Sequence, residues 1–302
     1  MSTQVKTQDR RQPRKGSLYG PQWGFLLPGL LLVFVMSIFP TIASLVLAFS
    51  RYDSRGFQGF VGFTNFINLM SGRHLWETLG NTLIFVFAGV ICQYLLGFGL
   101  AMLLTQKVAG RRFFRVLFLI PMMITPVAVA FLFRMMFDFR IGPLAPIMGL
   151  FGLQDVPWLG NGYLAKILII VGDTWQWTPF VLIVLLAALE ALPHEPYEAA
   201  IVDGATPWQL FWNITFPLML PVSSTVILIR MIEAFKIVDM PIVLTGGGPG
   251  VATESTTLFA YSTWRSFNLG EVSAIGYVLL ITVTLITTTY SNTIRKRLAG
   301  GY

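Results

Sequence analysis

The sequence predicts an all-α integral membrane protein with six transmembrane helices, and its composition and the length of its apolar runs carry this prediction. The chain has 302 residues, of which 55% are hydrophobic and only 12% charged, and its mean hydropathy is +0.69. Soluble domains contain about 25% charged residues, so this chain lacks the charge to cover itself with a hydrated surface. Because the apolar runs are continuous rather than alternating, a transmembrane β-barrel is disfavoured.

Six segments come close to or exceed the roughly 18–20 apolar residues that span a bilayer as a helix. Four of them contain no Asp, Glu, Lys or Arg: 24–49, 82–104, 116–133 and 272–293. In chain order the fourth span, 167–189, contains only the acid Asp173, and the fifth extends from about residue 216 to 244. The first run is far longer than the roughly 7–15 residues of a signal-peptide core, so we expect it to remain as an anchor.

The distribution of Lys and Arg predicts which ends of these helices face the cytoplasm. Basic residues gather before residue 24, in the loop 107–115 and after residue 294, and six spans put these three segments on one side. Cytoplasmic loops carry an excess of Lys and Arg. We therefore predict a multi-pass protein of the bacterial inner membrane with two cytoplasmic tails, 1–23 and 293–302. The basic residues are dispersed without a binding motif, so nucleic-acid binding is not indicated.

One predicted cytoplasmic loop departs from this pattern, since residues 190–213 contain four acids and no Lys or Arg. Acidic residues do not contribute to the excess of Lys and Arg that orients a membrane protein, so an acidic cytoplasmic loop suggests a basic partner. Locally, Pro196 can begin a short helix over 197–203, and Gly204 can end it in a left-handed conformation. Thr206-Pro207-Trp208-Gln209 matches a capping box that opens a second short helix. We expect this helix to end before Pro217.

The same loop resembles the EAA loop, the signature of the membrane subunit of binding-protein-dependent ABC importers. The family pattern is met at Glu198, Ala199, Ala200, Gly204, Ile214 and Pro217, with Phe216 where Leu is usual. The resemblance implies a loop over 195–217 that docks on an ATPase. It implies these coupling residues: Glu198, Ala199, Ala200, Asp203, Gly204, Trp208, Phe211 and Pro217. The alternative is an amphipathic interfacial loop without a partner.

A second resemblance is to carbohydrate-importer permeases of the maltose and glycerol-3-phosphate type. It is carried by Phe235-Lys236-Ile237-Val238-Asp239, by Leu244-Thr245-Gly246-Gly247-Gly248-Pro249 with Thr253, and by Asn81-Thr82. It implies a type I ABC importer transmembrane domain with a five-helix core over 77–292, flanked by the first helix. The implied partners are a second homologous permease, an ABC ATPase dimer and a periplasmic or lipid-anchored solute-binding protein that delivers a sugar. Gly246, Gly247, Gly248 and Pro249 would contact that binding protein.

Polar side chains inside the predicted spans are candidates for a substrate path, because intramembrane charges are costly and face cavities or partner charges. These candidates are Asn81, Gln93, Asp173, Trp175, Gln176, Glu233, Lys236 and Asp239. Together with Arg230, the residues Glu233, Lys236 and Asp239 form one charged stripe with i, i+3 spacing. That stripe is either a wall of the path or a structural ladder of ion pairs. Aromatic rings beside polar groups suit a sugar, or else the tryptophans face lipid as an interfacial belt.

No sequence motif indicates an enzyme. The chain has no phosphate-binding Gly-x-x-x-x-Gly-Lys-Ser/Thr motif, and His74 and His194 lack metal-site spacing. We expect no cofactor on this chain, with ATP and Mg bound by the separate ATPase, and we expect 246–250 to be a flexible external loop. The predicted function is a permease subunit of an ATP-driven, binding-protein-dependent importer that moves a sugar or sugar derivative by alternating access. A proton-coupled secondary transporter using the charged fifth helix is the alternative, although no internal repeat supports it.

Overall fold

The computed structural model describes residues 22–106, 109–138, 141–153 and 156–299, and it divides the chain into two compact units that meet between Val46 and Leu47. The first unit contains α1 (Gln22–Val33), the π turn η1 (Phe34–Ile38) and most of α2 (Phe39–Ala48). Together these elements form one apolar span, Phe25–Ala48, with mean hydropathy 2.6 over its most apolar window. This span confirms the first predicted membrane helix.

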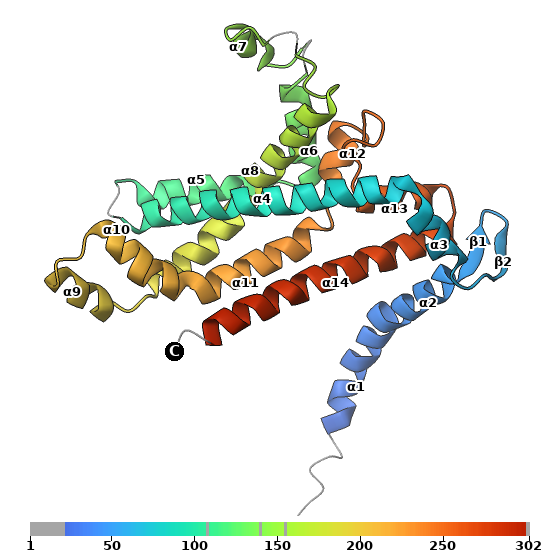
Figure 1. Cartoon of the computed structure of the whole chain (residues 1–302), viewed down its shortest axis with the longest axis horizontal. Helices are drawn as coiled ribbons and strands as arrows, with labels where there is room; N and C mark the ends of the chain where they lie inside the picture. Colours follow the sequence, from blue (N-terminus) through green and yellow to red (C-terminus); the bar gives the residue numbers. More distant parts are fainter. Residues whose placement is uncertain (1–21, 107–108, 139–140, 154–155, 300–302) are drawn as a thin grey trace, which may run out of the picture. The chain divides into compact units, whose positions relative to one another are not determined.

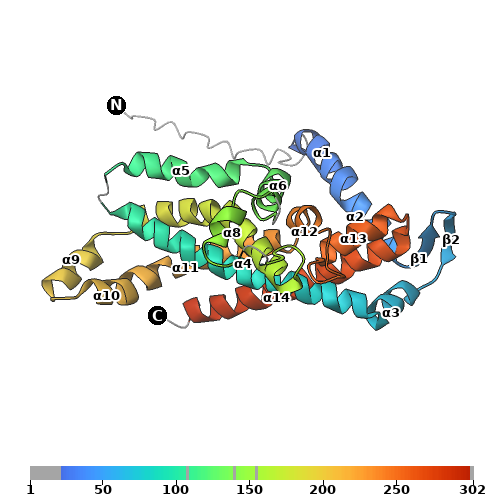
Figure 2. The same ribbon diagram turned by 90° about the horizontal axis from the view of Figure 1, so that it is seen from above.

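The second unit is helical apart from one β-hairpin among its described residues (Figure 1). Its elements are, in order, β1 (Ser50–Asp53), β2 (Gly56–Phe60), α3 (Thr64–Ser71), α4 (Arg73–Thr105), α5 (Arg111–Met123), α6 (Pro126–Met136), α7 (Ala145–Gly149), α8 (Gly162–Glu190), α9 (Glu195–Val202), α10 (Pro207–Leu210), the π turn η2 (Phe211–Thr215), α11 (Phe216–Ala234), α12 (Asp239–Leu244), α13 (Thr256–Arg265) and α14 (Leu269–Ala299). Helix α11 packs against both α4 and α14, and α8 packs across α4. Figure 2 places α9 and α10 at the opposite end of this unit from the hairpin.

Among the described residues, five helices are long and apolar enough to cross a membrane, or six if one bent pair counts as a single span. The bent pair is α5 and α6, which meet at 95°. The predicted span 116–133 is therefore broken in the middle rather than being one continuous helix. Thr125 is extended (φ −63°, ψ 142°) because the ring of Pro126 disfavours the α conformation in the preceding residue.

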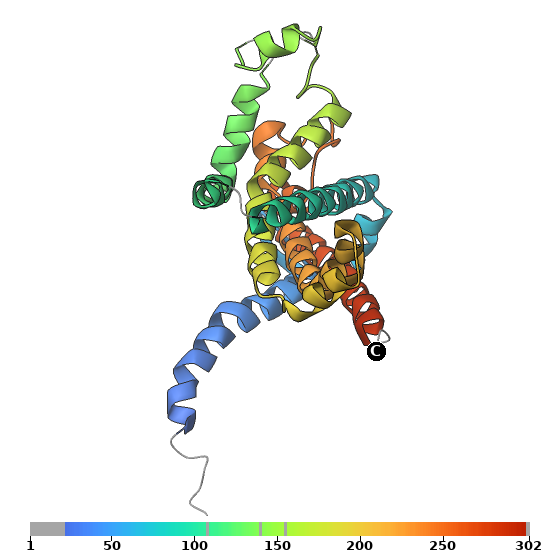
Figure 3. The ribbon, with the colours of Figure 1, turned by 90° about the vertical axis from the view of Figure 1, so that its left-hand side faces the viewer.

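The fifth predicted span also differs, because α11 ends at Ala234 and a separate helix, α12, begins at Asp239. The break frees backbone carbonyls that lipid could not satisfy. Hydroxyls of the segment that leads into α13 bind two of them. Ser255 Oγ donates to Ile237 O at 2.6 Å, and Thr257 Oγ1 donates to Phe235 O at 3.1 Å. Figure 3 shows α12 beside α6 and α8, against which it packs.

Contrary to expectation, the second helix of the EAA-like loop (residues 195–217) does not end before Pro217. The backbone stays helical from Pro207 to Ala234 and passes Pro217 after the π turn η2. A proline ring clashes with the carbonyl four residues earlier, which here is Asn213, inside the wider π turn. The first unit repeats this arrangement, with η1 two residues before Pro40. In both units the π turn accommodates the proline without breaking the helix.

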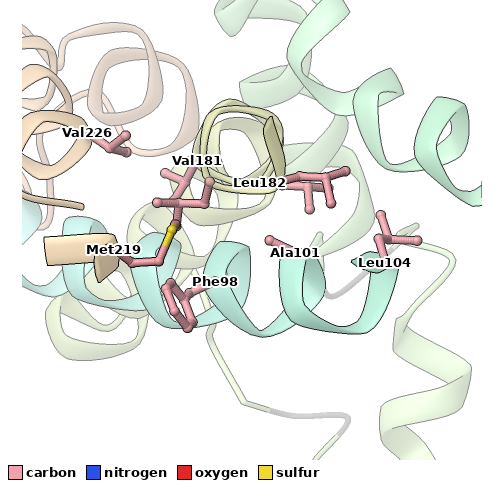
Figure 4. Close-up of a cluster of buried hydrophobic side chains, with 9 residues drawn as sticks. Phe98, Ala101, Leu104, Val181, Leu182, Met219 and Val226 are labelled. Atoms are coloured by element: carbon pink, nitrogen blue, oxygen red, sulfur yellow. The ribbon is translucent and has the colours of Figure 1, made fainter. Parts of the chain in front are cut away.

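The largest cluster of buried apolar side chains joins α4, α8 and α11. Figure 4 shows Met219 of α11 beside Val181 of α8 and Phe98 of α4. Helices α4 and α8 approach closely at Gly97, where an added Cβ would lie 2.8 Å from the Val181 side chain and 3.1 Å from Leu182 N. A larger residue at this crossing would force the two helices apart.

We expect Gly97→Val to destabilise the protein by about 1–3 kcal/mol, the cost of overpacking a close-packed core. Thermal unfolding of the purified protein in detergent measures the loss. Gly99→Val is the matched control, because Gly99 lies on the same helix and has no neighbouring atom within 4 Å of an added Cβ. Equal melting temperatures for the two variants would contradict the assigned crossing.

Candidate functional site

A buried ion pair joins three of the long helices. Arg230 of α11 donates from Nη2 to Asp173 Oδ2 of α8 at 2.7 Å and from Nε to Gln93 Oε1 of α4 at 2.6 Å. Gln93 Nε2 completes the ring by donating to the same carboxylate oxygen at 2.7 Å. Gln93 is fully buried, and Arg230 and Asp173 are 2% and 7% exposed. Every charge in this cluster therefore has a partner within the chain, as burial in a membrane protein requires.

A cavity of about 240 Å³ opens beside this cluster, and we call it the charged cavity. Its polar and aromatic lining comes from α8, from the end of α11 and from the segment that leads into α12: Asp173, Gln176, Trp177, Arg230, Glu233, Lys236 and Asp239. The Arg230 guanidinium lies 4.8 Å from the centroid of the Trp177 ring, a cation–π contact. Gln176 is fixed by a hydrogen bond from Nε2 to Ile124 O at 3.0 Å, at the break between α5 and α6. The two helix breaks thus adjoin the same cavity.

Of the eight path residues predicted from the sequence, five line the charged cavity: Asp173, Gln176, Glu233, Lys236 and Asp239. Gln93 lies behind the lining and holds Arg230 and Asp173. Trp175 instead packs against Phe133 at 6.0 Å and borders an apolar hollow on another side of α8. Asn81 is far along α4 and binds loop carbonyls, as described below.

The structure also brings Arg230 and Trp177 into the cavity lining. Arg230 was expected in the charged stripe, either as a wall of the path or in a ladder of ion pairs, and Trp177 was one of the tryptophans that suit a sugar or else face lipid. The sequence could have predicted that Arg230 pairs with Asp173. An intramembrane arginine needs a carboxylate, and Asp173 is the lone acid of the predicted fourth span. Trp177 lies two residues beyond Trp175, and sequence alone does not separate the two faces of the helix.

The charged residues of the fifth span do not form the continuous stripe that their spacing suggested. Arg230 pairs with α8 rather than with Glu233, and Lys236 Nζ lies 2.7 Å from Glu233 Oε1. Asp239 belongs to a different helix because α11 has already ended. Of the three i, i+3 pairs that the spacing suggested, only Glu233–Lys236 forms among the described residues, because Arg230 pairs with Asp173 and Asp239 lies beyond the break.

The glycine turn (residues 245–254) is held in place by hydrogen bonds rather than being the expected flexible loop. Thr253 is fully buried, and its Oγ1 donates to Gly248 O at 2.8 Å. Asn81 Nδ2 donates to Val251 O at 2.8 Å and to Glu254 O at 3.0 Å. Gly246 and Gly247 have φ of +66° and +93°, which glycine adopts without strain. Asn81 therefore anchors this turn rather than lining the cavity.

The EAA-like loop (residues 195–217) has the local structure that its sequence predicts. Helix α9 ends where Gly204 adopts φ +80°, and Ala205 N donates to Ala200 O at 2.9 Å. Thr206 and Gln209 form the capping box that begins α10. The predicted coupling residues Ala199, Ala200 and Pro217 lie within these helices, on α9 and α11.

Two contacts attach this loop to the helix bundle. Tyr197 Oη donates to the buried Thr215 Oγ1 at 2.9 Å, which ties α9 to η2. Phe211 packs against Phe98 of α4 at 5.9 Å and against the main buried cluster. Phe211, a predicted coupling residue, therefore contributes to the packing of the loop on the bundle.

The outer face of the loop combines apolar and acidic side chains. Val202 is 87% exposed and Trp208 is 70% exposed, with Ile201 also exposed. Among the described residues, no ion pair is formed by Glu195, Glu198 or Asp203, whereas Glu190 at the end of α8 binds Arg111 and Arg115 of α5. An apolar tip with unpaired carboxylates suits a partner surface that is apolar and basic.

A family model described as "Binding-protein-dependent transport system inner membrane component" matches residues 63–299. The chain belongs to this family. It is 35% identical to the trehalose/maltose transport system permease protein MalF of Thermococcus litoralis over 72% of this chain and 75% of that protein. It is 29% identical to the multiple sugar-binding transport system permease protein MsmF of Streptococcus mutans over 87% of this chain and 91% of that protein.

Among solved structures, a chain of a bacterial ABC transporter involved in the import of the acidic polysaccharide alginate is similar. Its TM-score is 0.81 with 22% identity, covering 91% of this chain and 94% of that chain. The fold is therefore that of a type I ABC importer transmembrane domain. Membership of the family of binding-protein-dependent permeases makes the chain a multi-pass transport component rather than an enzyme, and it gives no support to a proton-coupled secondary transporter.

We expect Arg230→Met or Asp173→Leu alone to destabilise the protein by about 3–5 kcal/mol, because each leaves an uncompensated buried charge. The double variant should recover most of this loss, since both charges leave together. Thermal unfolding in detergent of the four proteins forms a double-mutant cycle. Additive losses in the double variant would contradict the direct pairing.

Proposed function

We propose that this chain is the permease subunit of an ATP-driven importer that moves a sugar or sugar derivative across the bacterial inner membrane. The observation that carries the proposal is the charged cavity, which lies among the long helices of a binding-protein-dependent permease. The printed names of its relatives, which include trehalose/maltose, multiple-sugar and lactose transport permeases, support a carbohydrate cargo.

The cavity lining suits a sugar chemically. Trp177 offers an aromatic ring, on which the apolar C–H face of a pyranose can pack. Gln176, Glu233 and Asp239 supply amide and carboxylate groups that can bond to hydroxyls at the rim of the ring. A few polar groups around an aromatic surface fix the orientation of such a ligand without binding it too tightly to leave.

The proposal includes partners that complete the transporter: a second homologous permease, an ABC ATPase dimer and a solute-binding protein. ATP and Mg would bind to the ATPase, and no cofactor is needed on this chain. The clusters of Lys and Arg support cytoplasmic termini and a cytoplasmic EAA-like loop. Glu198 and Asp203 are then available for charge-assisted bonds to basic residues of the ATPase. The glycine turn, on the opposite side of the membrane, is the proposed contact for the binding protein.

Force has a direct route from the EAA-like loop to the cavity. The helix that begins at Pro207 continues without a break to Ala234 and carries Arg230 and Glu233. Movement of a docked ATPase would displace the loop, and the continuous helix would transmit that displacement to the cavity wall. The permease would thereby alternate between inward-facing and outward-facing states.

Purification from the native membrane in mild detergent, followed by mass spectrometry, tests the assembly. We expect an ATPase and a second six-helix permease to co-purify. In proteoliposomes supplied with the binding protein, we expect the complex to transport radiolabelled trehalose, maltose or lactose only when ATP is present on the side of the membrane that carries the ATPase. A chain that purifies alone or as a homo-oligomer and transports with a proton gradient would refute the proposal.

We expect Glu198→Lys and Gly204→Asp to leave the amount of protein in the membrane unchanged and to abolish transport. The first reverses the charge offered to the ATPase, and the second strains a left-handed position at a cost of about 1–2 kcal/mol. Gly56→Asp is the matched control, because Gly56 also has positive φ (+91°) and open space around it but lies in the β-hairpin. Wild-type uptake by the loop variants would disprove the coupling role.

A further inference from the structure

The cations that line the charged cavity are two, Arg230 and Lys236, and both are already bound to carboxylates of this chain. We propose that the cavity selects an uncharged cargo: it accepts the hydroxyls of a neutral sugar or polyol and excludes sugars that carry a phosphate, sulfonate or carboxylate. This inference rests on the proposed function and specifies its substrate class. The inference depends on which charged side chains of the cavity lining are paired and which one is unpaired.

The charge of Arg230 is already compensated within the chain. Its guanidinium binds Asp173 and Gln93 and lies against the ring of Trp177. The Arg230 side chain is only 3% exposed, and the Asp173 side chain is 10% exposed. An anion that bound Arg230 would have to compete with Asp173 for the guanidinium, and separating a buried pair leaves a carboxylate without its counter-charge. Arg230 therefore positions the cavity wall and does not serve as an anion site.

Lys236 is more accessible but is also paired. Its Nζ lies 2.7 Å from Glu233 Oε1, and the two side chains are 62% and 50% exposed. An incoming anion would compete with an intramolecular carboxylate that is already in place. The pair is neutral as seen from the cavity, so it attracts an anion weakly.

Asp239 determines the sign of the net charge of the cavity lining. Its carboxylate forms no ion pair or side-chain hydrogen bond among the described residues, although it lines the cavity. The lining therefore holds three acids and two cations, and the unpaired charge is negative. A carboxylate accepts hydrogen bonds from sugar hydroxyls, whereas it repels a second anion. Attraction to hydroxyls and repulsion of anions thus come from the same group.

Saturation-transfer NMR of the purified membrane complex in zwitterionic nanodiscs, without the binding protein, tests this selectivity directly. The probes are two matched pairs: glucose with glucuronate, and trehalose with trehalose 6-phosphate. We expect the neutral member of at least one pair to bind about tenfold or more tightly than its anionic partner, the ratio that one unpaired nearby charge produces in a partly hydrated site. Equal or tighter binding of the anionic members would overturn the inference.

Two variants examine the cause of the selectivity. Asp239→Asn removes the free carboxylate without breaking an ion pair, and we expect it to reduce the neutral-to-anionic ratio about threefold or more. Asp173→Asn keeps the shape of the side chain but frees the Arg230 charge, and we expect it to improve binding of the anionic probes about tenfold. Asp53→Asn, the same change in the β-hairpin, should leave the ratio unchanged. An unaltered ratio in Asp239→Asn, with wild-type affinity for glucose and trehalose, would contradict the assigned role.

The outcomes separate this inference from the proposed function. Import of a sugar that carries a phosphate, sulfonate or carboxylate, together with anion binding to the complex, overturns the inference and leaves the sugar permease intact. If none of the four probes binds and the complex imports no sugar, the proposed function itself is refuted. Import of a neutral sugar with preferential binding of the neutral probes supports both.

Discussion

The ion pair between Arg230 and Asp173 is the constraint on which the arrangement of the helices depends. Neither charge is tolerable alone inside a membrane protein, so α8 and α11 must keep these side chains in contact. Gln93 bonds to both and adds α4 to the same cluster. One polar cluster thus fixes three helices at the level of the cavity, while the apolar cluster around Phe98 and Met219 packs them elsewhere along their length.

The breaks in the helices and the continuous stretch of helix have different roles. The breaks after Met123 and after Ala234 place irregular backbone beside the charged cavity, where polar backbone groups adjoin polar side chains rather than lipid. The helix from Pro207 to Ala234 remains continuous, and its π turn preserves that continuity past Pro217. Irregular backbone forms the cavity, and regular backbone connects the cavity to the EAA-like loop.

The sequence predicted the features that depend on local physics. Long apolar runs identified the spans, and the capping box at Thr206 with Gly204 before it was confirmed. The helix break at Ala234 was not predictable in this way, because it is stabilised by hydroxyls of Ser255 and Thr257, about twenty residues further along the chain. For the same reason spacing alone paired Arg230 with Glu233, whereas the folded chain pairs it with Asp173. Side-chain partners that lie on other helices follow from packing and not from periodicity.

The pairing of charges also bears on how the cavity can bind and release a cargo. A buried ion pair contributes little net stability compared with apolar packing, but it is strongly specific for its partner. Because Arg230 is bound within the chain by Asp173 and Gln93, its pairing does not depend on whether cargo is present. A cargo that binds through hydroxyls can then arrive and leave without exchanging any ion pair. The unpaired carboxylate of Asp239 remains available to the hydroxyls of the proposed cargo.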